Sequence, residues 1–345
     1  MKINFILPGI GKTGGTAVVN RYASMLKNDG YDVEIYAPII SYNLHRKNNA
    51  LIDFLYQLYG TLKTFLEKRN YPYHWVFRIK DKYIRDADIT LATAWPTAYD
   101  VNELREECGG KIYFVQDYEV WDNYELGQKS YLLPLRKIVI SSWINEQLKK
   151  DLDIGPFEIC LNGIDTDFYS CDGLKDEKKG ITLLMLNHKL VKKGVRDGLE
   201  ACKRVKEKMP KVKVIMFGML SEKNLPDFVD EYYRDPSKEK IRELYCKADV
   251  FVFPSLSEGW GLTPIEAMAC GCAVVGYNTG FVLDIGNHME NMVVCESGNV
   301  DSLTAGVLDL CEDAVLRKKL GKSGRETVEK LDWDSAYNHF KGIIY

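Results

Sequence analysis

The 345-residue sequence lacks the features that would place it in a specialised class of protein. It has no excess of basic charge, because 46 Lys and Arg are set against 49 Asp and Glu, so binding of nucleic acid by a basic field over the whole molecule is not expected. It has no run of about eighteen apolar residues that would cross a membrane as a helix. Its composition, 46% hydrophobic and 28% charged, predicts a globular protein of about two domains.

The nine cysteines also lack a recognisable pattern. Their number is odd, they are scattered and no CxxC pair occurs, so neither a disulfide framework nor a metal site is predicted. We expect most of them to be small buried side chains in a reducing compartment. The amino-terminal stretch 1–8 is too short for a secretory signal and is expected to form a buried strand, so the predicted localisation is cytoplasmic.

Short apolar runs alternate with amphipathic stretches along the whole chain, which predicts parallel sheets covered by helices on both faces. The expected strands are 2–7, 32–37, 89–92, 112–115, 137–140, 181–186, 213–217, 250–253 and 273–277, and the expected helices are 16–28, 195–208, 241–246 and 264–270. The polar stretch 165–180 interrupts this alternation and is predicted to be a linker. The fold class is therefore α/β, with two doubly wound domains, 1–165 and 166–333.

A glycine-rich segment follows the first expected strand. Gly9 to Gly14 match G-x-G-x-x-G, but the second strand ends without the acidic residue that a dinucleotide's ribose requires, which argues against NAD. A phosphate loop ending in Gly11-Lys12-Thr13 would need glycine at position 6, where Ile6 stands. Gly14 and Gly15 then have two interpretations: a tight turn that needs positive φ, or a close backbone approach to an anion at a helix N-terminus.

The most informative segment is 253–271, where a buried strand ends, a loop with two glycines follows and a helix begins. The pattern predicts Thr263 as N-cap, Pro264 as the first helical residue and Glu266 as the closing member of a capping box. Glycines permit close approach of a ligand, and a helix N-terminus attracts a diphosphate. Glu258 and Glu266 are then placed to accept hydrogen bonds from sugar hydroxyls, which predicts a nucleotide sugar as ligand.

This segment resembles the signature of the retaining GT-B glycosyltransferases of family 4, the glycosyl transferases group 1. The resemblance covers nearly the whole chain and includes Gly14-Gly15 with its helix, residues 30–33, residues 162–165 with Phe168, Lys193-Gly194 and residues 331–333. It implies two Rossmann-like domains that face each other across a cleft. The first domain would bind the acceptor, the second would bind the donor, and a terminal helix, 334–345, would return to the first domain.

The resemblance also implies roles for individual residues of the second domain. Glu258 would contact hydroxyls of the transferred sugar, and Glu266 would hold the donor ribose. Lys193 and the backbone around Gly261, Leu262 and Thr263 would stabilise the departing diphosphate, as fixed positive charge and N–H groups do for developing negative charge. A lysine in this role requires no metal, and no cofactor is expected beyond the nucleotide-diphosphate sugar itself.

Two positions depart from the family pattern. His188 stands where an arginine is expected, so it either binds phosphate or is a strand-end histidine bonded to backbone. Asp117 stands about where many members have a histidine that faces the transferred sugar. It either orients the acceptor and stabilises positive charge at the anomeric carbon, or is an N-cap or loop aspartate.

The acceptor side of the predicted first domain contains an amphipathic stretch, 51–68, followed by basic and aromatic residues up to Arg85. Such a stretch is typical of a protein that associates peripherally with the cytoplasmic face of an anionic membrane. The acceptor would then be lipid-linked, as in surface-polysaccharide assembly. The alternative is a normal helix followed by a solvated loop. Rival functions are a GT-B epimerase of nucleotide sugars, an NAD-linked oxidoreductase and a non-catalytic sugar-binding protein. Residue spacing does not identify the nucleotide base, the sugar or the acceptor.

Overall fold

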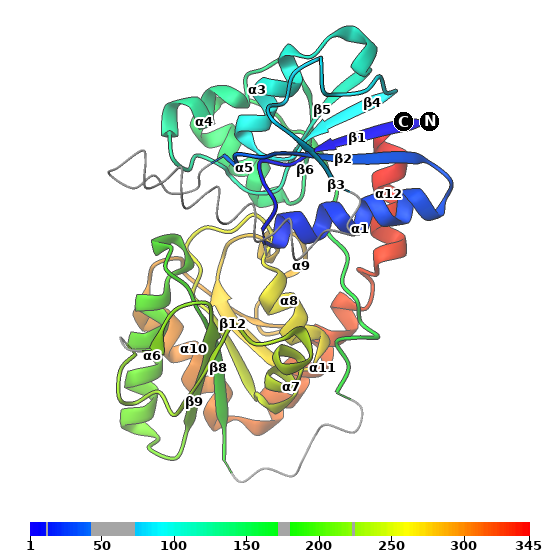
Figure 1. The fold of residues 1–345 in the computed structure, drawn as a ribbon. Helices are drawn as coiled ribbons and strands as arrows, with labels where there is room; N and C mark the ends of the chain where they lie inside the picture. The colour runs from blue at the N-terminus through cyan, green and yellow to red at the C-terminus, as the bar shows by residue number, and fades with distance from the viewer. Residues whose placement is uncertain (12, 43–72, 172–179, 223–224) are drawn as a thin grey trace. The chain divides into compact units, whose positions relative to one another are not determined.

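The computed structural model describes residues 1–11, 13–42, 73–171, 180–222 and 225–345 (Figure 1). The chain divides into two compact units. The first comprises Met1–Ile140, Ile144–Cys160 and Tyr337–Tyr345, and the second comprises Ser141–Trp143 and Leu161–Ala336. Each unit is built around a parallel sheet with helices, so the predicted α/β class is confirmed. Residues 51–68 and 172–179, which fall in the predicted amphipathic stretch and linker, lie outside the described residues.

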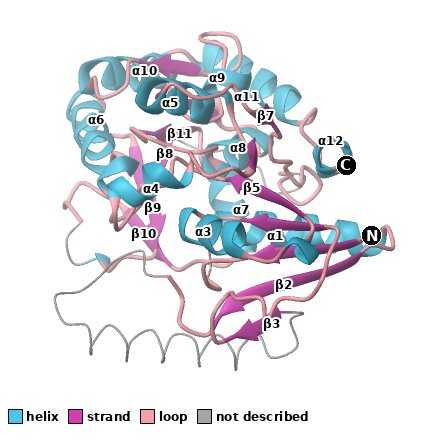
Figure 2. Ribbon diagram, turned by 90° about the horizontal axis from the view of Figure 1, so that it is seen from above, coloured by secondary structure: helices cyan, strands magenta, loops and turns pink. Residues whose placement is uncertain are grey.

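The described part of the first unit forms a seven-stranded sheet in the order β3-β2-β1-β4-β5-β6-β7. Its strands are β1 (Lys2–Ile6), β2 (Asp32–Pro38), β3 (Tyr73–Val76), β4 (Ile89–Ala92), β5 (Gly110–Val115), β6 (Arg136–Val139) and β7 (Glu158–Ile159). Figure 2 shows β2 and β3 side by side, and β2 pairs in parallel with β1 and with β3. Consecutive residues of β1 are fully buried because helices cover both faces of a parallel sheet, which is why these strands read as continuous apolar runs.

The helices of the first unit begin and end at residues with suitable backbone chemistry. Before α12, the described residues of this unit form α1 (Gly14–Asn28), α3 (Trp95–Glu103), η1 (Glu106–Cys108), α4 (Tyr124–Ser130) and α5 (Ser142–Leu152), the last with its first residues in the second unit. The Thr13 hydroxyl accepts the N–H of Thr16 and caps α1. Gly30, at φ +87°, ends that helix, as predicted.

The described part of the second unit forms a six-stranded parallel sheet in the order β10-β9-β8-β11-β12-β13. Its strands are β8 (Thr182–Asn187), β9 (Lys213–Gly218), β10 (Glu231–Arg234), β11 (Val250–Phe253), β12 (Ala273–Tyr277) and β13 (Val293–Cys295). Its helices are η2 (Val191–Lys193), α6 (Val195–Lys208), α7 (Lys238–Lys247), α8 (Leu262–Ala269), α9 (Val282–Ile285), α10 (Val300–Glu312) and α11 (Ala314–Val328). Figure 1 shows α6 and α10 on one face of this sheet and α7, α8 and α11 on the other.

The carboxyl end of the chain forms α12 (Trp333–Ile344), which begins in the second unit and ends in the first. Phe340 is fully buried, and its ring stacks on Tyr22 of α1 with 4.3 Å between ring centroids. The Tyr337 hydroxyl donates to Asp29 just beyond the end of α1. The last nine residues therefore complete the core of a unit whose other residues lie between Met1 and Cys160.

Two motifs that are far apart in the sequence meet within the second unit. The N–H of Ile164 donates to the Leu331 carbonyl at 2.8 Å, and Ile164 forms a parallel bridge with Asp332. A Cβ on Gly163 would lie 2.7 Å from the backbone of Trp333, so only glycine allows this approach. The glycine of residues 162–165 thus has a packing role.

The structure corrects one expectation about the cysteines. Cys171 and Cys246 form a disulfide between the segment before β8 and the last turn of α7, although no disulfide was predicted from the spacing of the cysteines. Disulfide pairing depends on where the two segments that carry the cysteines lie in the fold. Two thiols 75 residues apart therefore leave no local sequence pattern that predicts their pairing. The other seven cysteines are free and buried, as expected.

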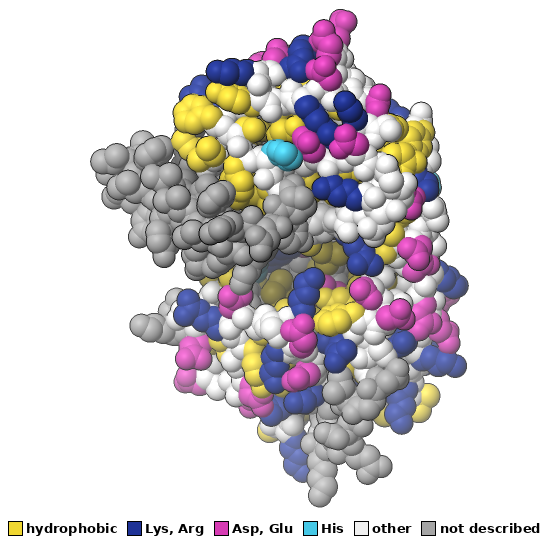
Figure 3. Space-filling view, turned by 45° about the vertical axis from the view of Figure 1, so that its right-hand side comes forward, with side chains coloured by type: hydrophobic (Ala, Val, Ile, Leu, Met, Phe, Trp, Pro, Cys, Tyr) yellow, Lys and Arg dark blue, Asp and Glu magenta, His cyan; other side chains and the backbone are white. Residues whose placement is uncertain are grey.

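The surface carries no strong charge of one sign on the face in Figure 3, where Lys and Arg side chains alternate with Asp and Glu. This mixture agrees with the formal net charge of −3. In the described part of the chain, no helix combines the length and the apolarity needed to cross a bilayer.

Candidate active site

Two loops at the carboxyl ends of adjacent strands form the centre of the candidate site. One follows β8 and carries Lys193, and the other follows β11 and carries Glu258. The N–H of Leu256 donates to the Lys192 carbonyl at 2.8 Å. Gly194 has a left-handed φ of +60°, and a Cβ there would lie 1.8 Å from the Pro254 carbonyl oxygen. The two loops are therefore locked together by backbone contacts that require glycine at 194.

Lys193 and Glu258 form an ion pair across these loops. The Lys193 ammonium donates to both carboxylate oxygens of Glu258, at 2.7 Å from Oε1. The side chains are 19% and 15% exposed, so the pair is partly shielded from water yet accessible. The structure thus brings together the two residues that sequence analysis named as the diphosphate-binding cation and the sugar-binding acid.

A third loop, which follows β12, braces the Glu258 loop and was not identified from the sequence. The Thr279 hydroxyl accepts the N–H of Glu258 at 3.2 Å, and the N–H of Phe281 donates to the Trp260 carbonyl at 2.8 Å. Gly280, at φ +59°, would place a Cβ 2.4 Å from that carbonyl oxygen. A glycine directly after a strand-end threonine is a turn signal that could have marked this loop.

The helix after the loop begins earlier than predicted. Helix α8 starts at Leu262, its N-cap is Gly261 with a left-handed φ of +105°, and no side chain caps it. The expected N-cap at Thr263 and capping box at Glu266 are therefore wrong, because glycine can adopt the cap conformation without a side-chain partner. Pro264 is still in the first turn, where its missing N–H costs no helical bond.

This first turn is suited to bind an anion. The leading N–H groups of an α-helix, here those of Leu262 and Thr263, have no acceptor within the helix. The turn carries no acidic side chain that would neutralise its positive end. Both residues are partly exposed.

Glu266 lies on the same helix and is held by two tyrosines. The hydroxyl of Tyr169 donates to Oε1 at 2.7 Å, and that of Tyr245 donates to Oε2 at 2.9 Å. Burial raises the pKa of the Glu266 carboxyl, and the two hydroxyl donors oppose that rise. Neither tyrosine carries a sequence signal that connects it to Glu266, because both contacts are tertiary.

His188 follows the end of β8, and its ring is bonded to its own loop. Nδ1 accepts the N–H of Leu190 at 3.1 Å. This contact matches the strand-end interpretation of the histidine. A role toward phosphate through the other ring nitrogen stays a prediction.

The remaining predicted site residues belong to the first unit. Helix α1 begins at Gly14, two residues before the predicted start at Thr16, and neither Gly14 nor Gly15 has positive φ, so the tight-turn explanation for them is wrong. A Cβ on Gly15 would lie 3.2 Å from the Gln116 side chain, so close packing accounts for this glycine. Asp117 follows β5, and its carboxylate accepts the N–H of Tyr118 at 2.9 Å. Gly14, Gly15 and Asp117 thus lie near the carboxyl edge of the first sheet.

Comparison with known proteins gives the site a family context. Residues 172–327 match the family model of glycosyl transferases group 1. The sulfoquinovosyl transferase SQD2 of Arabidopsis thaliana is 30% identical over 160 residues, which is 44% of this chain and 31% of SQD2. The capsular polysaccharide biosynthesis glycosyltransferase CapM of Staphylococcus aureus is 29% identical over 227 residues, 59% of each chain. The chain therefore spans about a third of SQD2 and less than two thirds of CapM.

The fold resembles solved structures over its whole length. The crystal structure of Anabaena HepE in complex with UDP and glucose has a TM-score of 0.68 and 14% sequence identity, and the match covers 100% of this chain and 99% of HepE. At this identity the likeness concerns the fold. The family match over residues 172–327 and the relatives therefore show that this part of the chain is similar to the glycosyl transferases group 1, and the solved structures show that the chain has the GT-B fold.

Proposed function

We propose that this chain transfers a sugar from a nucleoside-diphosphate donor to a glycan or lipid-linked acceptor, with retention of anomeric configuration and without a metal ion. The observation that carries the proposal is the Lys193–Glu258 pair, which Gly194 locks beside the end of β11. A cation and an acid next to an unneutralised helix N-terminus suit a ligand that has both a diphosphate and hydroxyl groups.

The chemistry follows from where charge develops. Cleavage of the bond between the anomeric carbon and the diphosphate oxygen leaves negative charge on the diphosphate. The Lys193 ammonium and the first N–H groups of α8 would offset that charge, while Glu258 accepts from a hydroxyl of the transferred sugar. Glu266 would accept from the ribose. These groups supply the electrostatic stabilisation for which other enzymes use a metal ion.

We propose that retention arises by a same-face route. The departing phosphate oxygen takes the proton of the acceptor hydroxyl, and the acceptor oxygen bonds to the anomeric carbon on the face that the phosphate leaves. Asp117 would orient the acceptor hydroxyl or stabilise the positive charge at that carbon. NMR of the product should show the donor's anomeric configuration. A glycosyl adduct trapped on Asp117 or Glu258 and found by mass spectrometry would refute the same-face route.

A nucleotide screen tests the donor class directly. We expect UDP, GDP or dTDP to raise the thermal unfolding midpoint and NAD to leave it unchanged, since a ligand that binds only the folded state stabilises it. The structure of HepE with UDP makes UDP the first nucleotide to test. Stabilisation by NAD alone would favour the oxidoreductase. Incubation with donor and no acceptor separates a transferase from an epimerase, which would release an isomerised sugar, and a chelator should leave transfer unchanged.

We also propose that the acceptor side contacts an anionic membrane. Phe77 and Tyr83 are 56% and 40% exposed, and the cations of Arg78 and Lys82 lie over their rings. Arg85, in contrast, is paired with Asp32 and is not available to a lipid surface. Flotation with vesicles that contain anionic lipid should recover the protein. The proposal would be contradicted if wild type did not float with the vesicles, or if the R78A and K82A variants floated as well as wild type.

A further inference from the structure

The two tyrosines that hold Glu266 come from different parts of the second unit. Tyr169 lies in the segment that precedes β8, and Tyr245 lies near the end of α7. Their hydroxyls donate to different oxygens of the same carboxylate, at 2.7 and 2.9 Å. Tyr245 is fully buried and Tyr169 nearly so, so neither hydroxyl can turn to water instead.

Two donors on one carboxylate define its orientation. An ionised carboxylate has about four acceptor positions, so Glu266 keeps acceptor capacity after the two tyrosine bonds are made. With each oxygen already bonded once, the plane of the carboxylate is set, and the remaining lone pairs have fixed directions. A diol needs this arrangement, because two neighbouring hydroxyls must donate to a carboxylate that does not rotate.

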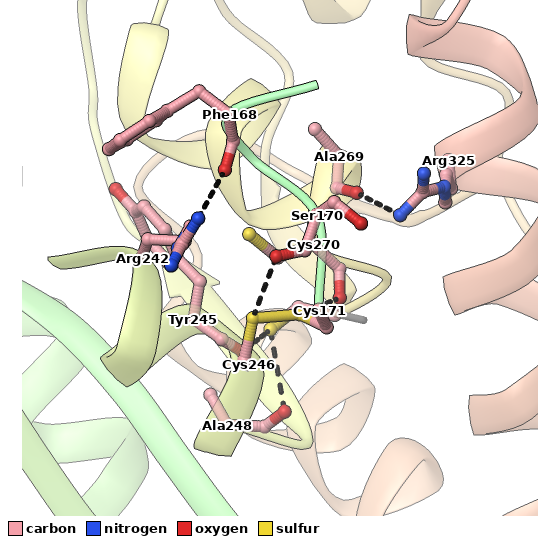
Figure 4. Close-up of a disulfide and its surroundings, with 11 residues drawn as sticks. Phe168, Ser170, Cys171, Arg242, Tyr245, Cys246, Ala248, Ala269, Cys270 and Arg325 are labelled. Atoms are coloured by element: carbon pink, nitrogen blue, oxygen red, sulfur yellow. Dashed lines mark hydrogen bonds between the residues drawn. A yellow bond between two sulfur atoms is a disulfide. The ribbon is translucent and has the colours of Figure 1, made fainter. Parts of the chain in front are cut away.

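The Cys171–Cys246 disulfide joins the same two segments (Figure 4). Cys171 is two residues after Tyr169, and Cys246 directly follows Tyr245. The Sγ of Cys171 lies 3.1 Å from the carbonyl oxygen of Cys270, the residue that ends α8. The disulfide therefore connects both tyrosine segments and touches the helix that carries Glu266.

A further contact holds the Tyr169 segment against α7. The Arg242 guanidinium donates to the Phe168 carbonyl at 3.3 Å and lies 5.2 Å from the centroid of the Phe168 ring (Figure 4). This contact and the disulfide lie on either side of Tyr169 in the sequence. The position of the Tyr169 hydroxyl is thus fixed from both directions along the chain.

We infer that Tyr169 and Tyr245 are positioning residues that aim the Glu266 carboxylate at the ribose diol of the donor, and that the Cys171–Cys246 disulfide keeps the two hydroxyls in place. This inference rests on the proposed function, which assigns the ribose to Glu266. It adds that selectivity for the ribose hydroxyls depends on residues that do not touch the donor. It also makes that selectivity sensitive to reduction of the disulfide.

The redox step balances with a dithiol as reductant. The dithiol loses two electrons and two protons and becomes a cyclic disulfide, while the Cys171–Cys246 bond breaks and each cysteine gains one electron and one proton. Reduction thus removes the covalent connection between the two segments and leaves non-covalent contacts such as that of Arg242 with Phe168. Dithiothreitol is the reductant used in the test.

The test compares UDP with 2′,3′-dideoxy-UDP, which lacks the ribose diol, in titrations of wild type and variants. Wild type should bind UDP more tightly than the dideoxy analogue. Y169F and Y245F should each weaken UDP binding about tenfold and leave binding of the analogue unchanged, because a hydrogen bond to a charged group has about this effect on affinity. E266Q should lose the same selectivity. Unchanged affinity for the analogue shows that the pocket itself is intact.

Y233F is the matched control, since the Tyr233 hydroxyl also donates to a glutamate, Glu231, but on β10. It should keep the wild-type preference for UDP. Dithiothreitol should lower the preference in wild type and have no further effect on the C171S/C246S variant, which should show the lowered preference from the start. C202A, at a free buried cysteine, should respond like wild type.

The outcomes separate this inference from the proposed function. Y169F and Y245F that prefer UDP over the dideoxy analogue as strongly as wild type does would refute the positioning role. The proposed donor site would stand in that case. If reduction leaves the preference unchanged, the role of the disulfide is refuted. A wild-type chain that binds none of UDP, GDP and dTDP refutes the proposed function, and this inference with it.

Discussion

The pair formed by Lys193 and Glu258 shows how two ordinary charged residues become a site. Each would be a solvated surface group if it stood alone. Backbone contacts between the loops after β8 and β11 bring them together, and partial burial strengthens their interaction. A lysine held in this way is a fixed positive charge for a developing anion, which a mobile surface lysine is not.

Removal of either charge should therefore reduce turnover far more than stability. We expect K193A and E258A to lower kcat by about 10²–10³, the effect typical of a lost electrostatic contact in a transition state. The measurement is sugar transfer under saturating donor, with circular dichroism to confirm the fold. K213A is the control, because Lys213 pairs with Glu231 at the surface and should keep normal turnover. Turnover of K193A within about threefold of wild type would contradict the assignment.

A second carboxyl, Asp100 in α3, gives a prediction for the pH dependence of stability. Burial raises its pKa to about 6, although the Tyr42 hydroxyl donates to it at 2.5 Å. Since the folded pKa lies above the unfolded value of about 3.9, the folded state binds more protons between these values. The contribution of Asp100 is complete below about pH 4 and is lost as the pH rises through 6.

The unfolding free energy of wild type should accordingly fall relative to that of D100N as the pH is raised from 4 to 7. The difference should be about 2 kcal/mol, from a shift of about two pKa units. Urea denaturation of both proteins at pH 4, 5 and 7 measures it. Parallel pH profiles for the two proteins would show that Asp100 has an ordinary pKa.

At the scale of elements, the start of α8 shows where sequence rules misplace a boundary. A threonine followed by proline and, two residues later, glutamate satisfies the rules for a capped helix, yet the helix begins at Leu262 after Gly261. The cap rules assume that a side chain must satisfy the first N–H groups. Here the glycine cap supplies no side-chain partner for those groups, and the glutamate that would have closed the cap is bonded to tyrosines instead.

The η2–α6 junction gives the second test at this scale. Gly194 combines a left-handed φ with direct contact to the Pro254 carbonyl, so G194A must move the loop that carries Lys193. We expect a loss of at least about 1–3 kcal/mol in unfolding free energy, the cost of a strained backbone, together with weaker donor binding. G342A is the control, because no atom lies within 4 Å of the added Cβ and φ is negative; it should be neutral or slightly stabilising. A G194A protein with normal stability and donor affinity would contradict the predicted role of this junction.

At the scale of the whole molecule, the chain end completes a core that begins at the other terminus. Phe340 contacts Phe5, Tyr22 and Phe114 through their rings, and all four side chains are fully buried. The last piece of the first unit, Tyr337–Tyr345, is thus separated from the other two pieces by Leu161–Ala336 of the second unit. Loss of the terminal ring should therefore affect β1 and α1, whose contacting residues Phe5 and Tyr22 lie more than 300 residues away along the chain.

Truncation of this ring should destabilise the first unit selectively. F340A is expected to cost about 3–5 kcal/mol, as large-to-small changes in cores do. Hydrogen exchange, followed by mass spectrometry, should show faster exchange in peptides of β1, α1 and β5 and little change in those of β8 and β9. F77A, at a side chain that is 56% exposed, should have little effect. Equal loss of protection in both units would show that they unfold together.

The sequence by itself determined the repeating strand–helix order, because burial on both faces makes a parallel strand a continuous apolar run. The bounds of β4, α6, β11 and β12 follow directly from those runs. It also determined Glu258, Lys193 and Glu266 as candidate residues, because their motifs are local.

Only the tertiary structure decided which groups meet. The tyrosine pair on Glu266, the Cys171–Cys246 disulfide and the brace from Thr279 join residues far apart in the chain. Short edge strands such as β3, β10 and β13 also escaped prediction. A contact between distant segments depends on how the whole sheet folds. A local pattern of residues therefore does not predict which distant segments come close in space.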